Sequence, residues 1–192
     1  MQYYQEITLL PDADISLNFL WTKIFTQLHI AFADRKNHTG VMDLAVSFPR
    51  YGEQTLGDKL RLIADSPEIL DDFGVSHVLA RYEDYVHMTK VRPVHENRIH
   101  GWAVYSRWQP KGALPGRARR YARRHDDTTY EEAMKLLKQK KGKGPYPPYI
   151  KMRSLTTGQT FSLFIRKEAV ETNTTGSIGT YGLSRDHAVP EF

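Results

Sequence analysis

Residues 112–125 carry the densest chemical signal in the chain, and they read GALPGRARRYARRH. Five of these residues are arginines, and no carboxylate follows until Asp126. The five are Arg117, Arg119, Arg120, Arg123 and Arg124. On a helix they would occupy about 160° of arc, with small and aromatic residues on the other side. Planar guanidinium groups contact phosphates and base edges in bidentate fashion, so this pattern predicts a surface for a polyanion.

The alternative interpretation of this segment is a basic surface helix with no specific ligand. A solvated helix face usually mixes acidic and basic residues, because like charges on one face repel each other. Residues 111–143 hold eleven Lys and Arg against four Asp and Glu, whereas the rest of the chain holds 16 against 18. The basic character therefore belongs to one region, which is typical of a nucleic-acid-binding surface.

Composition excludes several classes of protein. The 192 residues include no cysteine, which excludes disulfides, thiolate zinc sites and cysteine nucleophiles. No apolar run approaches the roughly 20 residues that a membrane helix needs. The N-terminal sequence MQYYQEITLL does not resemble a signal peptide. We therefore expect a cytoplasmic location and no membrane partner.

The first half of the chain reads as alternating strands and helices. The expected elements are a strand at 3–10, a helix of about 18 residues from Ser16, strands at 43–48 and 60–64, a helix from 66 to about 82, and a strand at 85–91. Residues 37–40 read as a loop, and Gly74 is a predicted break in the second helix. The order β-α-β-β-α-β predicts a ferredoxin-like unit of about 95 residues, a frequent RNA-binding scaffold.

The second half begins after residue 97 and surrounds the arginine segment with strands. The expected elements are a strand at 101–108, the arginine helix, a helix opened by a capping box at 129–132, and strands at 149–154, 160–166 and 176–182. Residues 140–148 read KKGKGPYPP, and this Gly- and Pro-rich composition predicts a basic loop.

Six separated motifs now match one family in family order. They are KIFTQLHIAF, VSFP, SRWQ, RRYARRHD, RSLTTGQTFSLFIR and TYGLS, and they span nearly the whole chain. With these motifs the chain resembles the type I-F CRISPR-associated endoribonuclease, which processes precursor CRISPR RNA (pre-crRNA). Each motif alone is weak, but together they are specific.

The resemblance implies a fold of the α+β class with two domains. A ferredoxin-like (RRM-like) domain would occupy residues 1–97, and an α+β domain with the arginine-rich helix would occupy residues 98–192. The implied partners are the stem-loop of the CRISPR repeat RNA, as precursor and as mature crRNA, and other subunits of the type I-F surveillance complex. The arginine helix would lie along the major groove of a short hairpin, where phosphate contacts set affinity and its salt dependence.

The resemblance also implies a reaction that uses no metal and no other cofactor. The RNA's own 2′-hydroxyl attacks the adjacent phosphate and leaves a 2′,3′-cyclic phosphate. His29 matches the catalytic histidine, Ser154 the serine that positions the 2′-hydroxyl, and Tyr181 the tyrosine that orients the histidine. Without the resemblance, each has a structural explanation: a histidine on a helix flank, a serine that bonds local backbone, and a strand aromatic. Whether His29 acts as base or as acid stays open.

Further residues match RNA contacts of the family. Arg107 and Gln109 match a pair that reads base edges near the foot of the stem, and Phe161 matches an aromatic that stacks there. His125 either touches phosphate or caps its own helix. Thr156 stands where the family has a second serine.

Besides Thr156, three positions depart from the family pattern, and two rival functions stay open. Glu191 stands where an aromatic residue is expected, and Ala118 and Ala122 stand where longer side chains are common. The main rival is a non-catalytic subunit that binds an RNA hairpin. The other is a basic protein that binds duplex DNA, which would not distinguish an RNA hairpin from its DNA counterpart because it does not recognise the 2′-hydroxyl.

Overall fold

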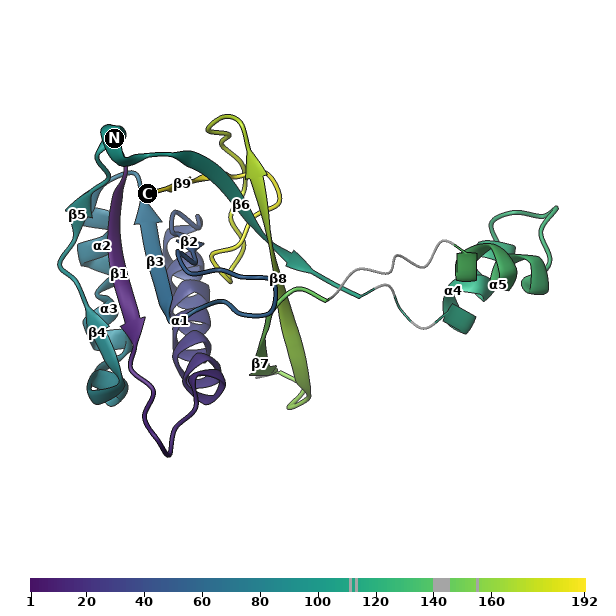
Figure 1. Ribbon diagram of the computed structural model, residues 1–192, viewed down its shortest axis with the longest axis horizontal. Coiled ribbons are helices and arrows are strands. Elements are labelled where there is room, and N and C mark those ends of the chain that lie inside the picture. The colour runs from purple at the N-terminus through teal and green to yellow at the C-terminus, as the bar shows by residue number, and fades with distance from the viewer. Residues whose placement is uncertain (111, 113, 140–145, 155) are drawn as a thin grey trace. The chain divides into compact units, whose positions relative to one another are not determined.

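The computed structural model of the chain describes residues 1–110, 112, 114–139, 146–154 and 156–192. By its internal packing the chain divides into two compact units (Figure 1). The first, called unit 1, contains Met1–Trp108 and Pro147–Phe192, and the second, called unit 2, contains Gln109–Tyr146. The domain boundary expected after residue 97 stays a prediction. Most of the loop expected at 140–148 lies outside the described residues.

Unit 1 contains two antiparallel sheets. The first has the order β2-β3-β1-β4, and β5 also pairs with β1. Its strands are β1 (Tyr3–Leu9), β2 (Ala45–Ser47), β3 (Lys59–Ala64), β4 (Val86–Met88) and β5 (Arg92–Pro93). The second sheet has the order β7-β8-β6-β9. Its strands are β6 (Gly101–Trp108), β7 (Tyr149–Arg153), β8 (Thr160–Val170) and β9 (Val189–Glu191).

The helices of unit 1 pack on the first sheet and link it to the second. They are α1 (Leu17–Thr39), α2 (Pro67–Phe73), α3 (Val75–Val78), and the 3-10 helices η1 (Ala80–Tyr85) and η2 (Glu96–Arg98). Figure 1 shows α1 and α2 on the same face of the first sheet, and α1 also packs against β7. One continuous hydrophobic core joins α1 to residues of both sheets. The fold is therefore of the α+β class, as predicted.

Unit 2 is a pair of helices, α4 (Leu114–Ala122) and α5 (Tyr130–Gln139). The predicted capping box at the start of α5 is confirmed. The Thr129 backbone N–H donates to the Glu132 carboxylate at 2.8 Å, and the Glu132 backbone N–H donates back to the Thr129 hydroxyl at 3.3 Å. These bonds satisfy two backbone donors that have no partner within the helix.

Several boundaries differ from the expected ones. The loop predicted at 37–40 is wrong, because α1 continues to Thr39 and ends at Gly40, whose φ of 77° is in the left-handed region that ends helices. The strand predicted at 176–182 is also wrong: only an isolated bridge joins Ile178 to Ser184 there. The chain turns instead, with Gly182 at a φ of 68°. No helix among the described residues is long and apolar enough to cross a membrane.

Candidate active site and cationic surface

His29 lies at the edge of the buried stripe of α1. The helix starts at Ser16, whose side chain accepts a hydrogen bond from the backbone N–H of Phe19. Phe25, Leu28 and Phe32 point into the core and are fully buried. A residue at position 29 follows Phe25 by one turn but is rotated away from the centre of that stripe. The imidazole is therefore half-buried, held on one side by core and open on the other.

The loop that contains Thr180 and Tyr181 supplies both contacts that fix the imidazole of His29. Nδ1 lies 2.8 Å from the backbone carbonyl oxygen of Thr180. A carbonyl oxygen only accepts, so Nδ1 is the donor and carries a proton. The ring of Tyr181 stacks on the imidazole, with centroids 4.0 Å apart and planes 10° from parallel. Nε2 is therefore the ring atom left to take or give a proton.

Glycine at position 182 allows this loop to turn where it does. Its φ of 68° is one that residues with a side chain rarely adopt. A Cβ added there would lie 2.5 Å from Cγ1 of Val46. The Gly182 carbonyl accepts a hydrogen bond from the Val46 backbone N–H at 2.9 Å, which ties the loop to β2. The backbone thus fixes the position of Tyr181 over His29.

Arg107 extends the same cluster from β6. Its guanidinium carbon lies 5.6 Å from the ring centroid of Tyr181 and 5.6 Å from that of Phe161 on β8. Both distances are within the range of cation–π attraction. The side chain of Arg107 is exposed, and no ion pair seen among the described residues includes it.

Ser154 follows β7 at the turn that leads into β8. Its hydroxyl accepts a hydrogen bond from the Thr157 backbone N–H at 3.2 Å, and its backbone carbonyl accepts one from Gly158 at 2.9 Å. Within the described part of the chain, no acceptor is seen for the hydroxyl proton of Ser154. Thr156 is exposed in the same turn. The Thr26 hydroxyl contacts the sulfur of Met152 at 3.8 Å, which places β7 one helical turn from His29 along α1.

The structure therefore gathers part of the expected site in unit 1. His29, Tyr181, Arg107 and Phe161 form one continuous series of contacts. No hydrogen bond seen among the described residues joins Ser154 to the imidazole or to Tyr181. Sequence reasoning missed Thr180, because its contribution is a backbone carbonyl that any residue could supply. The sequence feature that could have indicated the turn is Gly182 itself, which directly follows the predicted site residue Tyr181.

The arginine segment of unit 2 folds as α4 and the turn after it. Arg117, Arg119 and Arg120 lie in the helix. Arg123 and Arg124 lie just beyond its end, although their backbone N–H groups still bond Arg119 and Tyr121 carbonyls at 3.1 and 3.0 Å. Their side chains border two hollows of unit 2.

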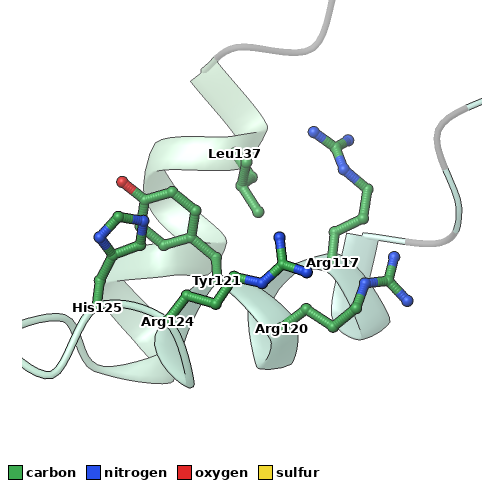
Figure 2. Close-up of a pocket in the computed structure, with 6 residues that line it drawn as sticks. All are labelled: Arg117, Arg120, Tyr121, Arg124, His125 and Leu137. Carbon is green, nitrogen blue, oxygen red and sulfur yellow. The ribbon is translucent and has the colours of Figure 1, made fainter.

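Figure 2 shows the first hollow. It is lined by Arg117, Arg120, Tyr121, Arg124, His125 and Leu137. The rings of Tyr121 and His125 lie against each other, with centroids 4.3 Å apart. The second hollow is lined by Arg119, Ala122, Arg123 and Tyr130. Gln109, the partner expected for Arg107, lies exposed directly after β6.

Two of the departures from the family pattern have a structural reason. Ala118 is fully buried with Ala133 and Leu137 in the small core of unit 2, and a longer side chain would push α4 and α5 apart. Glu191 accepts a hydrogen bond from the Tyr105 hydroxyl at 2.9 Å and pairs with Lys167. Burial, reinforced by the charge of Glu191, raises the pKa of Tyr105 above its ordinary value. Among the described residues, no group of three or more histidines and carboxylates could hold a metal ion.

Comparisons with known proteins agree with the resemblance seen in the motifs. The family model described as CRISPR-associated protein (Cas_Csy4) matches residues 4–192. A CRISPR-associated endonuclease Cas6/Csy4 of Escherichia coli (strain UTI89 / UPEC) is 34% identical, and the match covers 100% of both chains. Its namesake in Pseudomonas aeruginosa (strain UCBPP-PA14) is 32% identical over 100% of both chains. The chain therefore belongs to the Cas_Csy4 family of CRISPR-associated proteins.

Proposed function

We propose that the protein is an endoribonuclease that binds the stem-loop of CRISPR repeat RNA and cuts the precursor into crRNA. The 2′-hydroxyl next to the cut attacks the phosphorus, and the bond to the 5′-oxygen of the next nucleotide breaks. The products are a 2′,3′-cyclic phosphate and a 5′-hydroxyl. The family membership and the endonuclease names of two full-length relatives support the reaction class.

The geometry of His29 is the single observation that carries this proposal. In-line attack requires one group to remove the 2′-hydroxyl proton or to protonate the leaving 5′-oxygen. Histidine is the side chain whose charge changes near neutral pH. The Thr180 carbonyl holds the proton on Nδ1 and Tyr181 holds the ring plane, so Nε2 has a fixed direction. A ring fixed in this way exchanges a proton without first having to be oriented.

Ser154 would hold the reacting ribose. Its hydroxyl oxygen is oriented by the Thr157 backbone N–H, and its own proton can be donated to the 2′-oxygen. Thr156 offers a second hydroxyl in the same turn. The pairing of Met152 with Phe161 across the β7–β8 hairpin connects this turn to the aromatic that would stack on a base. No metal ion or other cofactor is part of the proposed reaction.

The arginines of unit 2 would bind the RNA stem. The side chains of Arg119, Arg120, Arg123 and Arg124 are exposed and Arg117 is half-buried. Guanidinium groups spread over the exposed side of α4 and the turn after it suit a helix that lies in a groove between two phosphate strands. His125 would add a phosphate contact beside Tyr121. Arg107 and Gln109 would read base edges at the foot of the stem, with Phe161 stacked beside them.

We also propose the finer fold assignment and the partners. Residues 1–97 form a ferredoxin-like domain, which the antiparallel order β2-β3-β1-β4 supports, and residues 98–192 form the hairpin-binding domain with the arginine-rich helix. The protein works in the cytoplasm, stays bound to the mature crRNA and joins other subunits of the type I-F surveillance complex. Many phosphate contacts would favour slow release of the product.

The test is cleavage of a CRISPR repeat hairpin in excess EDTA. A second RNA carries a single 2′-deoxy nucleotide at the cut. We expect the first RNA to be cut to a cyclic phosphate and the second to bind without being cut. Tight binding with no cutting of the first would favour the non-catalytic subunit. Cutting of both would mean that water is the nucleophile, which would contradict the roles of His29 and Ser154. Equal affinity for a DNA hairpin would favour the duplex-DNA binder.

A further inference from the structure

Tyr181 contacts two side chains to which the proposed function gives different tasks. Its ring stacks on His29 with centroids 4.0 Å apart, and it also lies 5.6 Å from the guanidinium carbon of Arg107. Phe161 lies at the same 5.6 Å from that guanidinium carbon. The proton-exchanging group and an RNA-contacting group therefore share one aromatic neighbour.

A guanidinium group has two kinds of surface, its flat faces and its edge. Aromatic rings contact the faces, and a hydrogen-bonding ligand contacts the edge. The flat faces stack on aromatic rings, whereas the N–H donors lie in the plane and point outward from the edge. Rings beside Arg107 restrict an otherwise long and mobile side chain, and they leave the edge available for two acceptor atoms of an RNA base. Ordering a side chain before binding removes an entropy cost that the complex would otherwise carry.

Arg107 depends on Tyr181 for its position, whereas Tyr181 does not depend on Arg107. Backbone hydrogen bonds hold the loop of Tyr181: Gly179 donates to Leu183, Gly182 to Gly179, and Val46 to Gly182, at 2.8, 2.8 and 2.9 Å. The ring therefore keeps its place through contacts that do not involve Arg107. The exposed guanidinium of Arg107, in contrast, has the rings of Tyr181 and Phe161 beside it and no ion pair within the described part of the chain.

We propose that Tyr181 is a shared positioning residue, which orients His29 for cleavage and at the same time holds Arg107 for RNA binding. This inference rests on the proposed function and adds a specificity role to a residue otherwise tied to catalysis alone. It makes base recognition and alignment of the imidazole depend on one ring. An RNA that fails to engage Arg107 would then lose affinity.

The test is a double-mutant cycle on RNA affinity, measured with the uncut 2′-deoxy hairpin so that His29 stays in place. The variants are Tyr181→Leu, Arg107→Ala and the double variant, with Tyr181→Phe as the control that keeps the ring. We expect Tyr181→Leu to weaken binding about threefold to tenfold, as the loss of a cation–π contact would. We expect Tyr181→Phe to bind like the parent protein, and Tyr181→Leu to add nothing once Arg107 is Ala.

A second readout separates positioning from a general structural effect. Single-turnover cutting of the normal hairpin at saturating protein should fall further in Tyr181→Leu than in Arg107→Ala, because only the first variant removes the ring that orients His29. Equal affinity of Tyr181→Leu and the parent would overturn the inference, and so would an equal loss in the presence and absence of Arg107, because a misfolded variant behaves in that way. A parent protein that fails to bind the hairpin, or that cuts the deoxy RNA, would instead overturn the proposed function, and the inference with it.

Discussion

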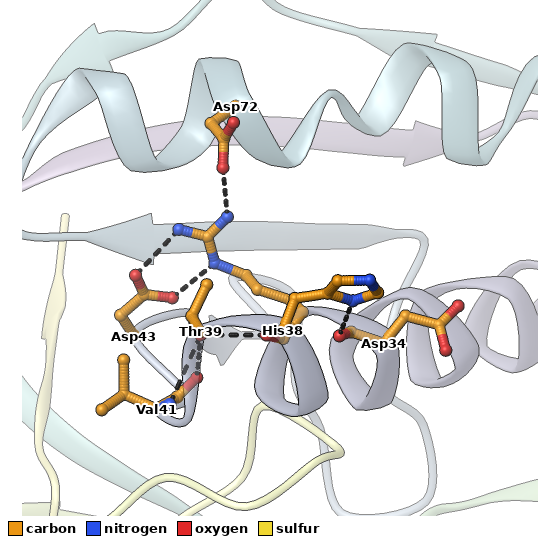
Figure 3. Close-up of polar contacts among 7 residues, drawn as sticks. Asp34, His38, Thr39, Val41, Asp43 and Asp72 are labelled. Atoms are coloured by element: carbon orange, nitrogen blue, oxygen red, sulfur yellow. Dashed lines mark hydrogen bonds and ion pairs between the residues drawn. The ribbon is translucent and has the colours of Figure 1, made fainter.

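In unit 1 the guanidinium group of Arg35 contacts two carboxylates, whereas no ion pair among the described residues includes any of the five arginines of residues 117–124 in unit 2. Arg35 donates two hydrogen bonds to Asp43, at 2.7 and 2.9 Å, and one to Asp72 at 2.7 Å (Figure 3). The bonds to Asp43 raise the pKa of Arg35 above its ordinary value and lower that of Asp43. All ion pairs seen among the described residues lie in unit 1.

This difference distinguishes charges that stabilise the fold from charges that are available to bind a ligand. A paired and largely buried cation stabilises its own unit, and its loss leaves an unpaired carboxylate. A cluster of exposed, unpaired cations destabilises its own surface by repulsion, and only an anionic partner relieves this. The comparison predicts that loss of a paired arginine such as Arg35 in unit 1 changes stability, whereas loss of an unpaired arginine in unit 2 changes RNA affinity.

The largest effect should come from His29→Ala, and His38→Ala is its matched control. Both histidines lie on α1, and the Nδ1 atom of each is 2.8 Å from a carbonyl oxygen. The partner of His38 is Asp34 in the same helix (Figure 3), and no aromatic ring stacks on it among the described residues. Loss of a general acid or base typically costs about 100-fold to 10,000-fold in rate. We expect His29→Ala to lose cutting by that factor, and His38→Ala to cut normally.

Affinity for the hairpin completes this test. Both variants should bind with the affinity of the parent protein in a filter-binding or fluorescence-anisotropy titration. If His29→Ala loses affinity and cutting by the same factor, the imidazole holds RNA rather than moving a proton. In that case the role of His29 as the proton-exchanging group fails.

The next effect in size is on stability, in Arg35→Met. The Arg35 side chain is 10% exposed, and its removal leaves Asp43 without its partner. Breaking a buried pair costs about 3–5 kcal/mol, and because Asp72 is 75% exposed we expect a cost somewhat below that range, about 2–3 kcal/mol. Urea unfolding measures the change. Arg81→Met, at an exposed site on η1, should leave the unfolding midpoint unchanged, and an equally stable Arg35→Met would show that the pair contributes nothing.

Much of the fold of unit 1 could be predicted from the sequence because local rules and burial agree there. Strands β3 and β6 follow from alternating or continuous apolar residues, and Pro67 after Ser66 marks the start of α2. The end of α1 could not be predicted in this way. Residues 37–39 are polar and suit a loop equally well, and Gly40 caps a helix as readily as it forms a turn.

The candidate site could be predicted only where the chemistry is in the side chains. His29, Tyr181, Arg107 and Phe161 were named from motifs, and the structure brings these four together. The contact between Arg107 and Tyr181 could not be predicted, because it depends on how β6 and a distant loop pack in three dimensions. The two hollows that the arginines border could not be predicted, because they depend on how the chain packs around α4, where Ala118 is buried against Ala133 and Leu137.

A smaller effect, on affinity alone, should come from Arg120→Ala. The side chain is exposed at the first hollow and pairs with no carboxylate among the described residues (Figure 2). Loss of one phosphate contact should weaken binding by about 1 kcal/mol and reduce the slope of log affinity against log salt by about one. Titrations between about 50 and 200 mM salt measure both quantities.

The control for this prediction is again at Arg81. Arg81→Ala removes the same charge from an exposed position on η1 in unit 1. It should leave both affinity and salt slope at the parent values. Unchanged affinity and salt slope in Arg120→Ala, together with a reduced salt slope in Arg81→Ala, would mean that the RNA phosphates contact η1 of unit 1 and not the first hollow of unit 2.

The smallest effect concerns acid, and it tests whether the paired charges of unit 1 contribute to stability. Hydrogen bonds from Arg35 lower the pKa of Asp43, and burial of Glu6 is outweighed by hydrogen bonds from Lys59 and Arg61, so the pKa of Glu6 is also lowered. A folded-state pKa below the unfolded value, about 4 for these groups, means that the unfolded chain binds protons more readily. The stabilisation is therefore complete above about pH 5 and is lost as the pH falls below about 4. In Arg35→Met the urea midpoint should fall less steeply over this range than in the parent, because Asp43 no longer contributes. Parallel curves would mean that the acid sensitivity of unit 1 arises from other carboxylates.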